Sequence, residues 1–78
     1  MTGTAILSDD GTVPEFRDIN WTLNKVYATG DLIEIWDGTG WINGVVTGGI
    51  SQWGIQTGTT HLRLIDFPNP PAGFVARL

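Results

Sequence analysis

The chain has 78 residues, a net charge of −4 at neutral pH, one histidine and no cysteine. The lack of cysteine excludes disulfides and thiolate metal centres, and one histidine without surrounding carboxylates argues against a zinc site. The four basic residues are scattered along the chain, whereas a phosphate backbone is bound by several converging cations, so we expect no nucleic-acid partner.

The sequence also gives no sign of a membrane segment. No apolar run approaches the roughly 20 residues of a transmembrane helix, and no basic amphipathic helix is present. The opening residues MTGTAILSDDG lack the basic start and long apolar core of a signal peptide. We therefore expect a cytoplasmic or virion-associated protein without membrane contact.

Short β-prone runs separated by turns follow one another along the chain, and helix signals are nearly absent. Residues 1–18 are predicted to be an N-terminal arm or an extra hairpin, with a weak strand at 3–7. Residues 19–27 should be extended and begin the main domain, 19–78. The further predicted strands are 31–37, 41–47, 52–57, 61–66 and, after a proline-rich connector at 67–71, a short strand within 73–78. This pattern is typical of a small all-β barrel or sandwich.

Side chains alternate between the two faces of a strand, which allows the faces to be assigned. We place the cleaner apolar set inside the barrel: Ile33, Ile35, Ile42, Gly44 and Val46. The next two strands would complete this core with Trp53, Ile55, Leu62 and Leu64. In the first extended segment, Ile19, Trp21 and Leu23 should share a face.

The same alternation leaves Leu32, Trp36, Trp41 and Val45 on the outside. The turn at 37–40 should pair the two strands as a hairpin and bring the two indoles together. Burying about 300 Å² of this surface would contribute roughly 7 kcal/mol before opposing costs, so we expect something to cover it. Three possibilities remain for what covers this surface: the chain's own residues 13–25, a second subunit, or a ligand or foreign partner.

The hydrophobic spacing of residues 29–67 resembles that of SH3-like barrels of the Tudor, Agenet and KOW kind. The resemblance is carried by Gly30-Asp31-x-Ile33-x-Ile35, Trp41-x-x-Gly44-x-Val46, Trp53-x-Ile55 and Leu62-x-Leu64. It implies a small barrel of about five strands with an extended N-terminal arm. This barrel supports many unrelated functions, so the resemblance says more about fold than about activity.

Two members of this group suggest specific functions. Tudor and Agenet modules bind methylated lysine or arginine in an aromatic cage, and the resemblance implies Trp36, Trp41 and Tyr27 as walls with Asp37 or Glu34 as the carboxylate. The alternative is that these aromatic residues are simply packed.

The type II dihydrofolate reductases are similar in length, in their N-terminal arm and in the Gly-Asp start of the barrel. Their pore-lining run is Val-Gln-Ile-Tyr, and the corresponding residues here are Leu62-Arg63-Leu64-Ile65. The groups that would contact cofactor and substrate are therefore replaced, which argues against reductase activity.

No pattern of catalytic residues stands out. Ser8, Ser51 and the Asp9-Asp10 pair lie in predicted turns, and His61 begins a predicted strand. We expect no enzyme activity, cofactor or metal, and interpret the chain as an interaction or assembly module that is homo-oligomeric or part of a larger particle of the phage or mobile-element type. The expected contact residues are Trp36, Trp41, Leu32, Val45, Tyr27 and Asp37. A peptide- or methyl-lysine-binding module and a reductase-like enzyme are the alternatives.

Overall fold

The computed structural model describes residues 1–48, 52–64 and 74–78. These residues form eight strands: β1 (Thr2–Leu7), β2 (Pro14–Asp18), β3 (Leu23–Val26), β4 (Leu32–Trp36), β5 (Trp41–Thr47), β6 (Gly54–Thr57), β7 (Thr60–Arg63) and β8 (Phe74–Arg77). The predicted all-β class is confirmed. Among the described residues, no helix is long and apolar enough to cross a membrane. The predicted connector at 67–71 lies outside the described residues.

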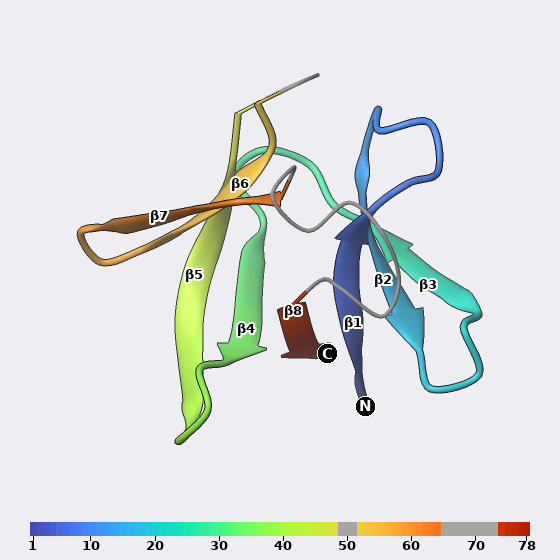
Figure 1. Cartoon of the computed structure of the whole chain (residues 1–78), viewed down its shortest axis with the longest axis horizontal. Helices are drawn as coiled ribbons and strands as arrows, with labels where there is room; N and C mark the ends of the chain where they lie inside the picture. The colour runs from blue at the N-terminus through green and yellow to red at the C-terminus, as the bar shows by residue number, and fades with distance from the viewer. Residues whose placement is uncertain (49–51, 65–73) are drawn as a thin grey trace.

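All eight strands belong to one antiparallel sheet with the order β3-β2-β1-β8-β4-β5-β6-β7 (Figure 1). Strands β1–β3 and β4–β7 are two meanders, each built from neighbours in sequence. Strand β8 joins them, because it pairs with β1 on one side and with β4 on the other. The ends of the chain meet beside this seam, where the Met1 ammonium donates to the Leu78 carbonyl (3.1 Å) and the Leu78 amide donates to Met1 (2.8 Å).

The expectation of about five strands in a closed barrel is not confirmed, because eight strands form an open sheet whose edges, β3 and β7, do not pair. Residues 1–18 do not form an extended arm: β1 and β2 pair as an antiparallel hairpin, the other possibility for this segment, and β1 is an inner strand between β2 and β8. The position of strand β2 was not predicted, because the strand carries a proline and three charges. Pro14 occupies the first strand position, where proline is tolerated, and Arg17 pairs with Glu15 at 3.0 Å.

The extended segment predicted at 19–27 is only partly a strand. A turn precedes β3, and Trp21 within it has a φ of +64°. Ile19 is 86% exposed. The register of β2 against β3 shifts at this point, since Phe16 opposes Lys25 but Arg17 opposes Leu23. This bulge breaks the alternation on which the predicted face depended.

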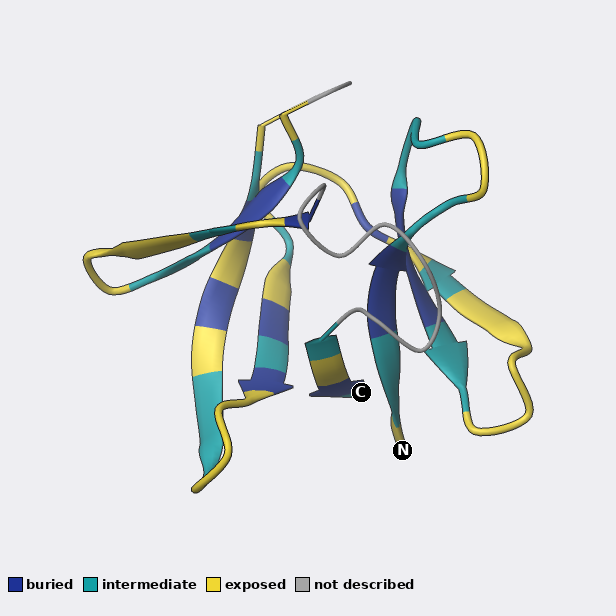
Figure 2. Cartoon of the chain, viewed as in Figure 1, coloured by how far each residue is buried: buried dark blue, intermediate teal, exposed yellow. Residues whose placement is uncertain are grey.

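The core follows the predicted alternation in β4–β7 (Figure 2). Both meanders contribute to one cluster of buried residues: Ala5, Phe16, Tyr27, Ile33, Ile35, Val46, Ile55, Leu64 and Ala76. Ile42, Trp53 and Leu62 are partly buried and pack against it. The indole N–H of Trp53 donates to the Thr12 carbonyl at 2.8 Å, so the β1–β2 turn is tied to the second meander and the open sheet curls around a shared interior.

Candidate interaction surface

The outer face of the β4–β5 hairpin exposes large apolar side chains. Leu32 is 77% exposed, Trp36 42% and Val45 37%, while Trp41 is half-buried. We call these four residues the outer patch. In the register of the hairpin, Leu32 opposes Val45 and Trp36 opposes Trp41, with the polar pair Glu34 and Asn43 between them. The outward orientation predicted for these residues is therefore confirmed.

The two indoles of the outer patch hold each other in place. Their ring centroids lie 5.5 Å apart at an interplanar angle of 69°, the edge-to-face arrangement that aromatic rings favour. The predicted proximity of Trp36 and Trp41 across the turn is confirmed. Because each ring limits the rotamers of the other, the pair presents a surface that loses little side-chain entropy on contact.

Asp37 builds the turn that sets this geometry. Its Oδ1 accepts hydrogen bonds from the Thr39 amide, the Thr39 hydroxyl and the Gly40 amide at 2.8–3.0 Å. These bonds hold the pKa of Asp37 below its usual value, since they favour the charged form. Gly38 supplies the positive φ of +103° that the turn requires. Asp37, predicted as a binding residue, thus has a structural task beside the patch.

Strand β8 brings an arginine, Arg77, next to the outer patch, and no sequence pattern predicted this position. The Arg77 guanidinium stacks over the Trp41 ring with its central carbon 4.5 Å from the centroid. Its Nη2 and Nε donate to Glu34 Oε2 at 2.7 and 3.0 Å. A cation from the same chain therefore already occupies one face of the Trp41 ring, with a carboxylate beside it.

Tyr27 does not join the two tryptophans. It is 2% exposed and packs in the core, so Trp36, Trp41 and Tyr27 do not form the three walls of a cage. Burial, followed by the charge of Asp31, raises the pKa of Tyr27 to about 12. Its hydroxyl is buried and has no hydrogen-bond partner in the described part of the chain, while Lys25 Nζ lies 5.1 Å above its ring.

Sequence reasoning also missed two apolar neighbours of the outer patch. Val75 is 47% exposed and Leu78 is 50% exposed. Val75 shares the outer face with Arg77 because Ala76 between them is buried. Leu78 and Arg77 line a shallow depression of about 260 Å³ next to Leu32. The strand itself was predicted, but its position beside β4 has no signal in the local sequence.

The chain's own residues 13–25 do not cover the patch as one alternative proposed. Phe16 is fully buried in the core on the opposite face of the sheet. Ile19, Trp21 and Leu23 are exposed and belong to the turn and strand at the β3 edge. The outer patch is therefore open in a single copy of the chain.

Polar clusters elsewhere are turn structures. Asp10 Oδ1 accepts from the Ser8 and Thr12 hydroxyls, both at 2.7 Å, and from the Thr12 amide at 3.1 Å. These bonds lower the pKa of Asp10 to about 2. His61 Nε2 lies 2.8 Å from the Thr47 hydroxyl at the sheet surface. Within the described ranges, no group of three His, Cys, Asp or Glu residues could hold a metal ion.

Comparison with known proteins leaves the outer patch to be interpreted from its own geometry. No family model matches the chain, and no curated protein or solved structure matches it.

Proposed function

We propose that this protein is a non-catalytic interaction module that pairs with a second copy of itself through the outer patch. The observation that carries the proposal is the exposure of Leu32, Trp36 and Val45 on one regular hairpin. A contiguous apolar surface on a small protein typically marks a contact site. The fixed edge-to-face geometry of the two indoles supplies the rigid aromatic anchor common at the centre of interfaces.

The charges next to the outer patch favour a second copy as the partner. Glu34 and Arg77 lie side by side there, and the side chain of each is 40% exposed. A two-fold interface brings the same surface of both copies together, so a surface that carries both signs can complement itself. The gross contribution of about 7 kcal/mol for 300 Å² is comparable with the cost of association, so we expect a weak to moderate dimer. Membership of a phage-type or mobile-element particle stays a prediction from the sequence.

We further propose that β4–β7 is related to the strands of SH3-like barrels. The proposal is supported by the hydrophobic spacing of these strands and by the burial of Ile33, Ile35, Val46 and Ile55. An experimentally determined structure in which β4–β7 superposes on such a barrel would support it, and one in which their curvature differs would contradict it.

The dimer is tested by light scattering across a series of micromolar concentrations. The wild-type mass should rise above the 8.5 kDa of one chain, and Leu32→Glu should hold it near that value, because Leu32 is 77% exposed and the new charge would be trapped in the interface. Val26→Glu is the matched control, since Val26 is 49% exposed on the distant strand β3. A wild-type protein that stays monomeric throughout, or equal effects of the two substitutions, would contradict the proposal.

The Tudor-like alternative is favoured by one contact, the Arg77 guanidinium over Trp41. A methylated lysine could take this ring only if Arg77 left it. The alternative therefore requires Arg77→Ala to bind methyl-lysine peptides more tightly than the wild type, as measured by tryptophan fluorescence. The reductase alternative requires loss of nicotinamide absorbance in the presence of dihydrofolate, and we expect none.

A further inference from the structure

We infer that the chain carries a second self-contact, in which the turn between β2 and β3 inserts Ile19 and Trp21 into an apolar groove of another copy. The groove shares only Trp36 with the outer patch. We call residues 18–22 the anchor turn. The groove reaches the edge of the sheet opposite to β3 and is lined by residues of β4 to β8 and of the turn between β4 and β5. This inference does not rest on the proposed function of the outer patch.

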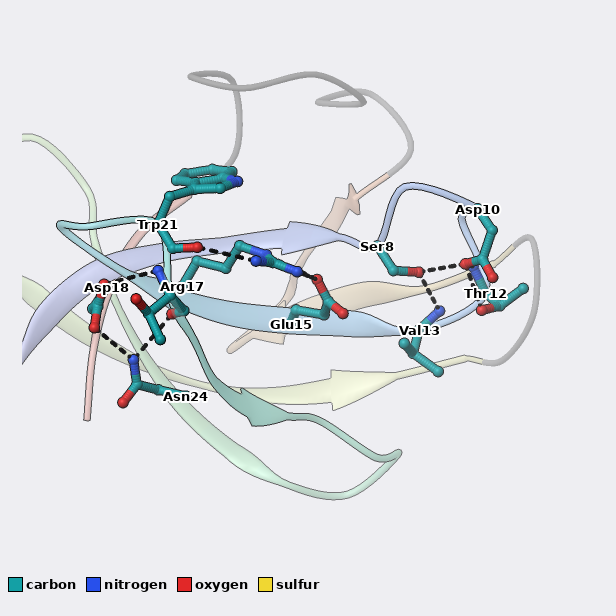
Figure 3. A network of polar contacts seen from close by, with 10 residues as sticks. Ser8, Asp10, Thr12, Val13, Glu15, Arg17, Asp18, Trp21 and Asn24 are labelled. Carbon is teal, nitrogen blue, oxygen red and sulfur yellow. Dashed lines mark hydrogen bonds and ion pairs between the residues drawn. The ribbon is translucent and has the colours of Figure 1, made fainter.

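The anchor turn is rigid because Asp18 organises it (Figure 3). Asp18 Oδ1 accepts from the amides of Asn20 and Thr22 at 2.9 and 3.0 Å, and Oδ2 accepts from Asn24 Nδ2 at 2.9 Å. These bonds hold the pKa of Asp18 below its usual value. A turn fixed in this way loses little conformational entropy when it binds.

The backbone of the anchor turn is strained at its aromatic residue. Trp21 has a φ of +64°, a conformation that glycine and asparagine adopt readily and bulky residues rarely. Its amide donates to the Asp18 carbonyl at 2.9 Å, and its own carbonyl accepts from Arg17 Nη1 at 3.0 Å. A small residue would adopt this turn conformation with less strain, so the presence of tryptophan indicates a role other than forming the turn.

The side chains at the anchor turn are apolar and exposed. Ile19 is 86% exposed, Trp21 39%, and Leu23 just after the turn 43%. In Figure 3 the Trp21 ring stands away from the polar groups that fix the turn. The turn thus presents two apolar side chains as a projection, which fits a concave apolar surface.

The same chain offers such a concave surface. The groove has a volume of about 420 Å³, within the range of pockets that hold small ligands. Its apolar residues are Ile35, Trp36, Ile42, Leu62 and Phe74, and its polar residues are Asp37, Thr57 and Thr60.

The polar chemistry of the two surfaces is complementary. An indole N–H is a donor that requires an acceptor once it is buried. The groove provides acceptors in the Asp37 carboxylate and the Thr57 and Thr60 hydroxyls, next to apolar residues that suit Ile19.

The anchor turn does not reach the groove of its own copy. The anchor turn adjoins β3, at one edge of the sheet, while Thr57 and Thr60 flank the turn into β7, at the other edge (Figure 1). The contact must therefore join two copies head to tail, which produces rings or open chains rather than a two-fold pair. The area available is small, so we expect association that becomes visible only at high protein concentration.

The test first disrupts the outer patch with a substitution. It then examines whether two variants, each defective in one side of the second contact, associate when they are mixed. In a Leu32→Glu background, sedimentation velocity at about 1 mM, where even weak contacts with millimolar Kd are populated, should still show association. Adding Ile19→Asp to that background should abolish the association, and so should Thr60→Lys, because each removes one side of the contact. Both positions are exposed, and circular dichroism checks that each variant is folded.

Mixing these two variants in equal amounts should restore a species of two chains, because one intact turn then meets one intact groove. The inference would be overturned if either double variant still associated, or if their mixture stayed monomeric. It would also be overturned if the Leu32→Glu protein itself were monomeric at this concentration. The proposed function is judged separately, by the effect of Leu32→Glu at lower concentration. Trp21→Asn is a second anchor variant: it relieves the strained φ, so it should lose association while keeping or gaining stability.

Discussion

At the scale of single residues, Tyr27 shows how one side chain can be conspicuous in the sequence and have a different role in the fold. A bulge between β2 and β3 shifts the alternation, so Leu23 is exposed while Tyr27 enters the core. Leu32 and Val45, on a hairpin without a bulge, point outward as their spacing predicts. Alternation could therefore predict the outer patch but not the place of Tyr27, because a single extra residue reverses the face of everything beyond it.

We expect Tyr27→Phe to stabilise the protein by about 1 kcal/mol at neutral pH, because a buried hydroxyl without a partner costs roughly that much or more. The folded-state pKa of about 12 exceeds the ordinary value of 10.0. The wild type should therefore lose stability as the pH rises from 10 towards 12, and the variant should lose less. Urea unfolding at neutral and alkaline pH measures both effects. Destabilisation by Tyr27→Phe would show that the hydroxyl makes a bond that matters.

At the scale of elements, the β4–β7 meander was predictable, whereas strand β2 of the first meander was not. Strands β4 to β7 alternate cleanly and are separated by glycine-rich turns, so local pattern is sufficient. Strand β2 begins with Pro14 and its charged residues Glu15 and Arg17 neutralise each other. The pairing of these charges is not visible in the sequence. For this reason the sequence of β2 resembled that of a polar loop.

Gly44, which the alternation placed in the interior, lets its surroundings approach closely. A Cβ at Gly44 would lie 2.7 Å from Ile55 Cγ2 and 3.1 Å from the Gln56 carbonyl. We therefore expect Gly44→Ala to destabilise the protein by about 1–3 kcal/mol through overpacking. Gly40→Ala is the control, since nothing lies within 4 Å of its would-be Cβ. Equal unfolding midpoints for the two variants in urea would contradict this packing.

At the scale of the whole molecule, the decisive feature is the place of β8. The sequence predicted a short strand near residue 74, but pattern alone does not state which strands will be its neighbours. Its insertion between β1 and β4 makes one sheet from two meanders. It also brings Arg77 onto Trp41 and Val75 onto the outer face. This long-range pairing explains why part of the candidate site was beyond sequence reasoning.

We expect deletion of residues 74–78 to abolish cooperative unfolding, because β1 and β4 would each lose a partner and Ala76 would leave the core. Moving the same residues ahead of Met1 through an Asn-Gly turn should restore folding, since β8 and β1 run antiparallel and the chain ends meet. Circular dichroism during thermal unfolding distinguishes the two variants. Failure of the rearranged chain to fold would show that connectivity, and not only the presence of the strand, is required.

The place of β8 has a consequence for biosynthesis. On the ribosome, the other seven strands emerge before the one that unites them. Until then β1 and β4 keep open edges, which are the features that recruit chaperones or promote aggregation. Closure must then bring Thr2 opposite Arg77, nearly the full length of the chain, and such distant pairing slows folding. The nascent protein is thus most vulnerable in the interval before β8 emerges.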